Sequence, residues 1–75
     1  MKIGDILLNE GSAKTDPNRV VMIIGYDSDF IHALSMNGNK VTCCKVGLKE
    51  GYMKIIGHQN FDVFEKLYRE NCTGV

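Results

Sequence analysis

The chain has 75 residues, 44% of them hydrophobic, with nine basic and nine acidic residues and no formal net charge. This length predicts one small domain over residues 1–75, with no room for a second core. The charge balance lacks both the basic surplus typical of nucleic-acid binders and the acidic excess of a DNA mimic. The composition therefore favours a protein partner or a small ligand.

Cysteine usage and hydropathy predict the cellular setting. The three cysteines are odd in number, and the adjacency of Cys43 and Cys44 is unfavourable for a disulfide framework. No apolar run is long enough for a membrane span, and the first residues do not resemble a signal peptide. We therefore expect a reduced, cytoplasmic protein with no membrane partner. Because so small a domain gains burial by self-association, a homo-oligomer is an alternative to a monomer.

The first third of the chain predicts two strands separated by a long loop. A strand is expected over residues 3–8, where a glycine and an aspartate precede an apolar run. Residues 9–18 contain glycine, serine, aspartate and proline, which predict a loop of a length that is often functional. The apolar run over residues 19–26 predicts a strand that is covered on both faces or bent into a barrel.

A β-hairpin is predicted in the middle of the chain. Strands over residues 30–36 and 40–46 flank the pair Asn37-Gly38, which suits a two-residue type I′ turn. Such a turn places His32 opposite Cys43, with Cβ atoms about 5 Å apart. Both faces of the hairpin are partly apolar, and a one-residue slip would exchange them, so the sequence leaves the buried face open.

The last third of the chain predicts a fifth strand and one helix. The strand is expected over residues 52–56, after a connection at 47–51, and the helix over residues 61–70, with Asn60 as its N-cap. Residues 71–75 are expected to fray. The apolar face of the helix is predicted from four residues at helical spacing: Phe61, Phe64, Leu67 and Tyr68.

This pattern resembles the small SH3-like β-barrels that are common among bacterial and phage proteins. The resemblance rests on the opening Lys2-Ile3-Gly4-Asp5-Ile6-Leu7, the apolar strand that ends in Gly25-Tyr26, and the Asn37-Gly38 hairpin. It covers residues 2–57 and implies a small five-stranded antiparallel barrel. With the helix predicted over residues 61–70, the expected fold is mainly β, an SH3-like barrel with a C-terminal α-helix. The resemblance also implies a binding scaffold, although the chain has no Trp and lacks the aromatic groove of proline-peptide-binding SH3 domains.

Candidate catalytic and metal-binding residues are few. The predicted proximity of His32 and Cys43 would suit a nucleophile pair or half of a zinc site. The remaining His58, Cys44 and Cys72 do not have the spacing of a zinc motif, so a structural role is favoured and no cofactor is predicted. The aspartates at loop ends are expected to stabilise turns: Asp5, Asp16, Asp27 and Asp29.

The leading hypothesis is a non-enzymatic protein-interaction module. The resemblance implies a phage or mobile-element protein that modulates a host factor or an assembly. One alternative is nucleic-acid binding by Lys40, Lys45 and Lys54 with Tyr52 on one sheet face. Another is a small metal protein or enzyme that uses His32 and Cys43. The candidate binding residues come from the long loop and the hairpin: Lys14, Asp16, Asn18, Arg19, Ile31, His32, Lys40 and Lys45.

Overall fold

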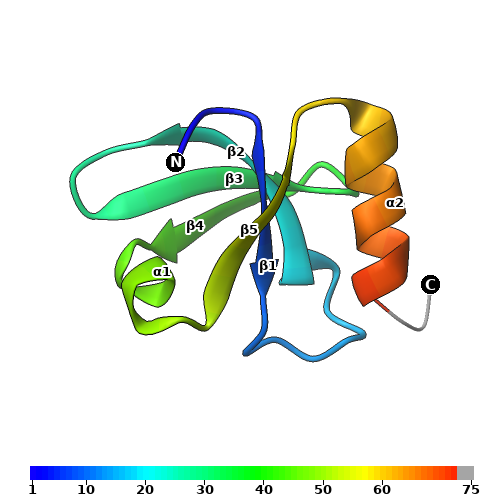
Figure 1. The fold of residues 1–75 in the computed structure, drawn as a ribbon, viewed down its shortest axis with the longest axis horizontal. Coiled ribbons are helices and arrows are strands. Elements are labelled where there is room, and N and C mark those ends of the chain that lie inside the picture. The colour runs from blue at the N-terminus through cyan, green and yellow to red at the C-terminus, as the bar shows by residue number, and fades with distance from the viewer. Residues whose placement is uncertain (73–75) are drawn as a thin grey trace.

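The computed structural model describes residues 1–72 as one antiparallel sheet with three helical segments (Figure 1). The strands are β1 (Asp5–Asn9), β2 (Val20–Tyr26), β3 (Phe30–Ser35), β4 (Lys40–Cys44) and β5 (Met53–His58). The helices are the 3₁₀-helix η1 (Pro17–Arg19) and the α-helices α1 (Val46–Glu50) and α2 (Phe61–Asn71). The predicted class, mainly β with a C-terminal helix, is confirmed. Within residues 1–72, no helix is long and apolar enough to cross a membrane.

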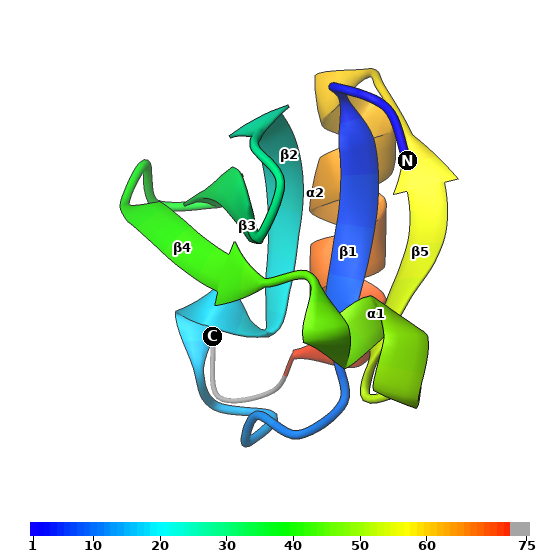
Figure 2. The same ribbon diagram turned by 90° about the vertical axis from the view of Figure 1, so that its left-hand side faces the viewer.

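The sheet is open, with the strand order β4-β3-β2-β1-β5. Within the described residues β4 pairs only with β3, and β5 pairs only with β1, so the predicted barrel closure is not confirmed. Figure 2 shows β1 and β2 between α2 on one side and β4 with α1 on the other. The two edge strands are joined through α1, which occupies the connection that the sequence predicted to be a loop.

Strand β1 and the first half of β2 are buried on both faces, in keeping with their nearly continuous apolar sequences. Successive side chains of a strand point to opposite faces, so each strand contributes to two clusters. The helix-side core, packed against α2, contains Ile6, Leu8, Val20, Phe64 and Cys72. The α1-side core contains Leu7, Val21, Ile23, Ile31, Ala33 and Met53, with Val41, Cys43 and Leu48 partly buried against it.

Helix α2 begins where the side chain of Asn60 accepts a hydrogen bond from the Asp62 amide at 2.9 Å. Phe64 is buried, and Leu67 and Tyr68 pack beside it, as predicted. Phe61 is 61% exposed, so its assignment to the apolar face was wrong. It is the first residue of the helix and lies one turn before Phe64, ahead of the turn that contacts the sheet.

The predicted fraying of the C-terminus was wrong for its first two residues. Asn71 is the last residue of α2, and Cys72 is only 6% exposed in the helix-side core. The Arg19 side chain donates from Nε to the Asn71 carbonyl oxygen at 2.9 Å, which anchors the end of the helix to the start of β2. Residues 73–75 of the predicted tail lie outside the described residues.

The central hairpin has a three-residue loop and not the predicted two-residue turn. The Gly38 amide donates to the Ser35 carbonyl at 3.0 Å, and the Ser35 amide donates to the Asn39 carbonyl at 2.9 Å. Within this loop only Gly38 has a positive φ, at +85°, as in a type I turn followed by a left-handed residue. This register places Ile31 opposite Cys43 and Ala33 opposite Val41, which puts the apolar residues of both strands on one face.

The short helix α1 and the extension of β5 were not predicted. Helix α1 ends at Gly51, whose φ of +91° provides the left-handed C-cap. Strand β5 continues through Gly57 to His58, with a bulge opposite Ile6 and Leu7. A glycine is required at 57 because a Cβ there would lie 2.6 Å from Cδ1 of Leu67 in α2.

Candidate functional site

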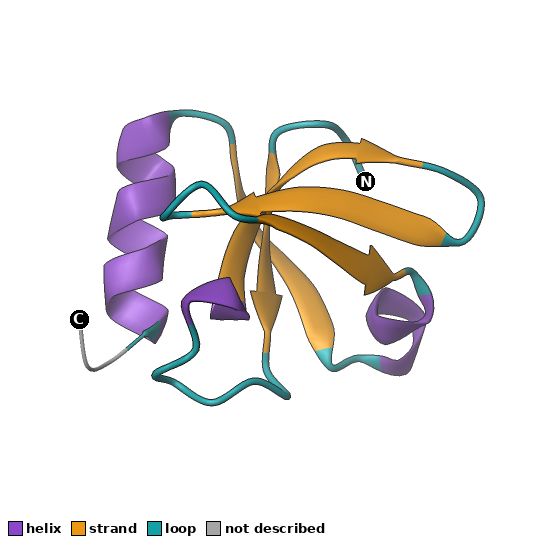
Figure 3. Cartoon of the chain, turned by 180° about the vertical axis from the view of Figure 1, so that it is seen from behind, coloured by secondary structure: helices purple, strands orange, loops and turns teal. Residues whose placement is uncertain are grey.

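A shallow groove of about 530 Å³ opens on the α1 side of the sheet. The groove lies where β4, α1 and the start of β5 face the segment that runs from the end of β1 into η1. Figure 3 shows this segment below the sheet. The lining residues are Asn9, Ser12, Asp16, Asn18, Val41, Thr42, Cys43, Cys44, Val46, Gly47, Tyr52 and Met53. The groove therefore brings together segments that are far apart in the sequence.

The floor of the groove is apolar. Val41 and Cys43 point from β4 toward the α1-side core and stay only partly buried. Met53 closes the floor from β5 at 6% exposure, and a Cβ on Gly47 would lie 2.6 Å from its Sδ atom. Gly47 thus allows α1 to approach Met53 closely. An apolar side chain of a ligand would find partners here.

One side of the groove is the free edge of β4. Along an antiparallel ladder, residue pairs that exchange hydrogen bonds alternate with pairs that do not. The Ser35 amide bonds to the Asn39 carbonyl and the Lys45 amide to the Asp29 carbonyl, each at 2.9 Å, so these bonds show which residues of β4 face β3. Val41 and Cys43 therefore bond to β3, while the main-chain groups of Thr42 point away from it, as do those of Lys40 and Cys44. Within residues 1–72 no strand pairs with this edge.

The loop side of the groove is polar. The Asp16 side chain caps η1 by accepting from the Asn18 amide through Oδ1 at 2.8 Å. Oδ1 of Asn18 is enclosed and has no hydrogen-bond partner among the described residues. At the opposite rim, Tyr52 donates from its hydroxyl to Oε2 of Glu50 at 2.8 Å, which raises the pKa of the tyrosine. This rim presents hydrogen-bond acceptors.

Arg19, predicted as a binding residue, holds the loop in place. Its Nη1 atom donates to the carbonyl oxygen of Ser12 and lies 3.4 Å from those of Asn9 and Glu10, while Nε reaches Asn71. The guanidinium thereby ties the loop to the end of α2. Lys14, predicted from the same loop, is exposed and does not line the groove.

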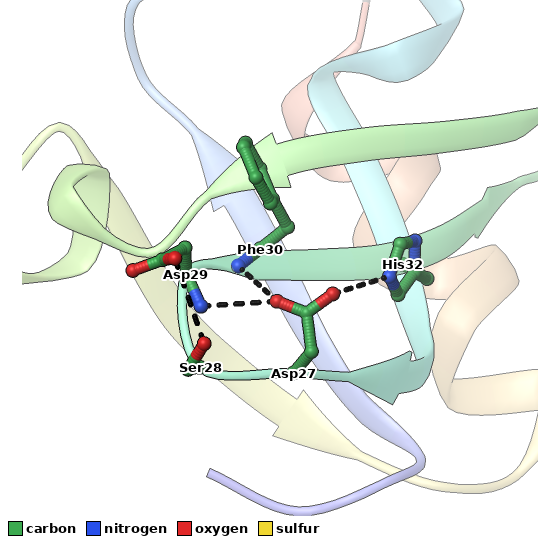
Figure 4. Close-up of polar contacts among 5 residues, drawn as sticks. All are labelled: Asp27, Ser28, Asp29, Phe30 and His32. Atoms are coloured by element: carbon green, nitrogen blue, oxygen red, sulfur yellow. Dashed lines mark hydrogen bonds and ion pairs between the residues drawn. The ribbon is translucent and has the colours of Figure 1, made fainter.

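His32 lies outside the groove, in β3, where its side chain reaches the turn between β2 and β3. Figure 4 shows Asp27 accepting from the amides of Asp29 and Phe30 at 3.0 and 2.9 Å, while its other oxygen lies 3.3 Å from Nε2 of His32. The two amides, together with His32, hold the pKa of Asp27 below its usual value. The predicted turn-stabilising role of this aspartate is confirmed.

The predicted pairing of His32 with Cys43 was wrong. His32 is opposite Thr42, so His32 and Cys43 occupy opposite faces of the hairpin. Burial raises the pKa of the Cys43 thiol, which is the reverse of what activates a cysteine nucleophile. Within residues 1–72 no group of three or more His, Cys, Asp or Glu residues is arranged to hold a metal ion.

The lysines proposed for nucleic-acid binding are not gathered on one surface. Lys40 and Lys54 belong to the two opposite edge strands, β4 and β5, with three strands between them. Nζ of Lys54 lies 3.2 Å from Oε1 of Glu10, and Nζ of Lys45 lies 5.0 Å from the ring centroid of Tyr26. Each of these two charges thus has a local structural partner.

Of the predicted binding residues, Asp16 and Asn18 line the groove. Ile31 was wrong, because it is fully buried in the α1-side core. Sequence reasoning missed Thr42 and Val46, which line the groove from β4 and α1, and it named Tyr52 only beside the lysines of the nucleic-acid alternative. The signal for them was indirect, since an edge strand is recognised only once the strand order is known.

The groove is assembled from distant parts of the chain. Its residues come from five separate segments, and none of them forms a contiguous sequence motif. Comparison with known proteins finds no matching protein family, no matching curated protein and no matching solved structure.

Proposed function

We propose that the chain is a non-enzymatic protein-interaction module that binds an extended segment of a partner protein in the groove. The observation that carries the proposal is the free edge of β4 beside the apolar floor of the groove. An extended segment that adds to a sheet edge gains main-chain hydrogen bonds, and its alternate side chains enter pockets. The proposed partner strand would bond to the outward main-chain groups around Thr42.

The other edge of the sheet is less suited to this role. Strand β5 carries a bulge, which interrupts a regular ladder, and Lys54 beside it is paired with Glu10. Bulges and lysines are common devices that protect edges from pairing. Strand β4 has no register shift against β3 over its five residues. The contrast favours β4 as the binding edge.

The strand order also supports the finer fold assignment. Strands β1 to β4 form a meander, β5 pairs with the outer side of β1, and the two clusters show that the sheet is covered on both sides. We propose that it is an open variant of an SH3-like barrel, a scaffold that serves mainly in binding. The gap between β4 and β5 is then the place where a ligand strand is added.

Capture of partners from a cell lysate tests the proposal when it is combined with edge variants. Thr42→Pro removes an outward N–H without removing a ladder bond, and proline is tolerated at such edge positions. Thr42→Val retains the N–H and is the matched control. Ile55→Pro makes the same change on β5, where Ile55 follows the bonded positions Tyr52 and Lys54 and its main-chain groups therefore point away from β1.

We expect a protein that is retained by the wild type, T42V and I55P after nuclease treatment and is lost from T42P. For the purified partner, loss of one main-chain hydrogen bond weakens binding about tenfold. Thermal unfolding verifies that T42P is folded. Equal retention by T42P, or loss of all retained protein on nuclease treatment, would refute the proposal.

A further inference from the structure

Among residues 1–72, Asp16 is the one Asp, Glu, Lys or Arg that lines the groove. Its Oδ1 atom accepts from the Asn18 amide at 2.8 Å, and Oδ2 accepts no hydrogen bond within residues 1–72. The groove therefore holds a carboxylate oxygen that is available to a ligand. Asp16 lines the same groove as Thr42, which belongs to the free β4 edge.

The nearest guanidinium does not neutralise this carboxylate. Arg19 follows Asp16 by three residues, but its donors are directed to main-chain carbonyls of the loop and of Asn71. No salt bridge within residues 1–72 includes Asp16. Arg19 thus shapes the loop and leaves the charge of Asp16 unpaired.

The opposite rim reinforces the negative character of the groove. Tyr52 lines the groove and donates a hydrogen bond from its hydroxyl to Glu50, so a second carboxylate lies close to the groove. No lysine or arginine lines the groove. The floor beneath these acceptors is apolar, formed by Val41, Cys43 and Met53.

From this combination we infer that the bound segment carries a lysine or arginine that pairs with Asp16, with apolar side chains at alternate positions that contact the groove floor. The inference rests on the proposed binding of an extended segment along β4. A strand added to β4 directs every second side chain toward Val41 and Cys43. A cation is the complementary charge for a partly buried, unpaired carboxylate.

The probe is a displayed library of random 12-residue peptides, selected in parallel on the wild type, Asp16→Asn and T42P. Asparagine is as good an N-cap as aspartate, so D16N keeps the bond to the Asn18 amide and removes only the charge. We expect wild-type selection to enrich peptides with one Lys or Arg within an alternating apolar pattern. This enrichment should be lost on T42P, and the cation preference should be lost on D16N.

A double-mutant cycle with synthetic peptides then isolates the ion pair. The enriched lysine peptide should bind D16N about tenfold more weakly than the wild type, whereas its norleucine analogue binds both equally. Only the lysine peptide should lose affinity as salt is raised. Enrichment that depends on Thr42 but shows no cation preference, or equal binding of the lysine peptide to D16N, overturns the inference and leaves the proposed function standing. Enrichment that T42P does not reduce overturns both.

Discussion

The two faces of the sheet are closed in different ways. On the helix side, α2 lays Phe64, Leu67 and Tyr68 across the sheet, and the chain returns to bury Cys72 beside them. On the α1 side, the curl of the sheet and a five-residue helix provide the cover, and Val41 and Cys43 remain partly exposed. Helix α2 buries Phe64 and Cys72 against the sheet and leaves Leu67 and Tyr68 partly buried. The shorter cover on the α1 side leaves an apolar floor beside a free edge, the two features that a strand-like ligand requires.

The largest expected effect tests the helix side. Phe64→Ala removes a ring that is 5% exposed in the helix-side core, so the free energy of unfolding should fall by about 3–5 kcal/mol. Urea denaturation measures this change. The matched control is Phe61→Ala, at 61% exposure, which should change it by less than about 0.5 kcal/mol. Similar effects of the two variants would show that α2 does not pack as described.

A second change tests how closely α2 approaches the sheet. Gly57→Ala places a methyl group 2.6 Å from Cδ1 of Leu67, which should cost about 1–3 kcal/mol of stability. Gly25→Ala is the control, because a Cβ there has no neighbour within 4 Å. Thermal unfolding of both variants makes the comparison. A neutral Gly57→Ala would mean that the helix can move away from β5 at little cost.

A substitution in the groove should stabilise the protein, in contrast to the two changes on the helix side. Oδ1 of Asn18 is enclosed without a partner, so Asn18→Ala removes an unsatisfied acceptor and should raise the free energy of unfolding by about 1 kcal/mol. Asn60→Ala, the same substitution at the N-cap of α2, should instead lower it by about 1 kcal/mol. Chemical denaturation compares the two. Destabilisation by Asn18→Ala would indicate that this oxygen is satisfied in solution.

The smallest effect at neutral pH concerns Asp5, which shares a strand face with Leu7 in the α1-side core. Its carboxylate accepts from the Lys2 amide at 2.7 Å and lies 2.6 Å from Nδ1 of His58, and these contacts hold its pKa below the ordinary value of 3.8. The resulting stability is present above that ordinary value and is lost as the pH falls through the lowered pKa.

Asp5→Asn should therefore flatten the acid limb of the stability profile. Thermal unfolding midpoints of the wild type and the variant, measured from neutral pH down to about pH 2, give the comparison. The wild type should lose its advantage over the variant in the acidic part of this range. A constant difference between the two across the whole range would mean that the carboxylate is not held in its charged form by these contacts.

Local sequence patterns predicted most of the strands and helix α2, because hydrophobic runs, caps and helical spacing each act over a few neighbouring residues. The runs around Ile6 and Val20 are apolar enough to require cover on both faces, and they form the two central strands. The cap at Asn60 and the helical spacing of Phe64 and Leu67 predicted α2 to within one residue at its C-terminal end. Helix α1 escaped prediction because its five residues include Gly47 and are followed by Gly51, so they carry almost no helical signal.

The register of the hairpin needed information from beyond the turn. The Asn37-Gly38 pair suits a two-residue turn, but the structure uses three loop residues, because that register aligns Ile31 and Ala33 with Val41 and Cys43 toward one core. Burial of these side chains outweighed the local preference of the turn. The predicted contact between His32 and Cys43 was lost for this reason.

By itself the sequence determined the charge balance and the mainly β class with a C-terminal helix, since propensity and hydrophobic patterning act over a few residues. Tertiary structure alone decided which strands lie at the edges, which face of the hairpin is buried, and that Asp16, Thr42 and Tyr52 meet around one groove. Those features depend on contacts between distant segments, whose geometry is set by packing the whole chain around its two cores.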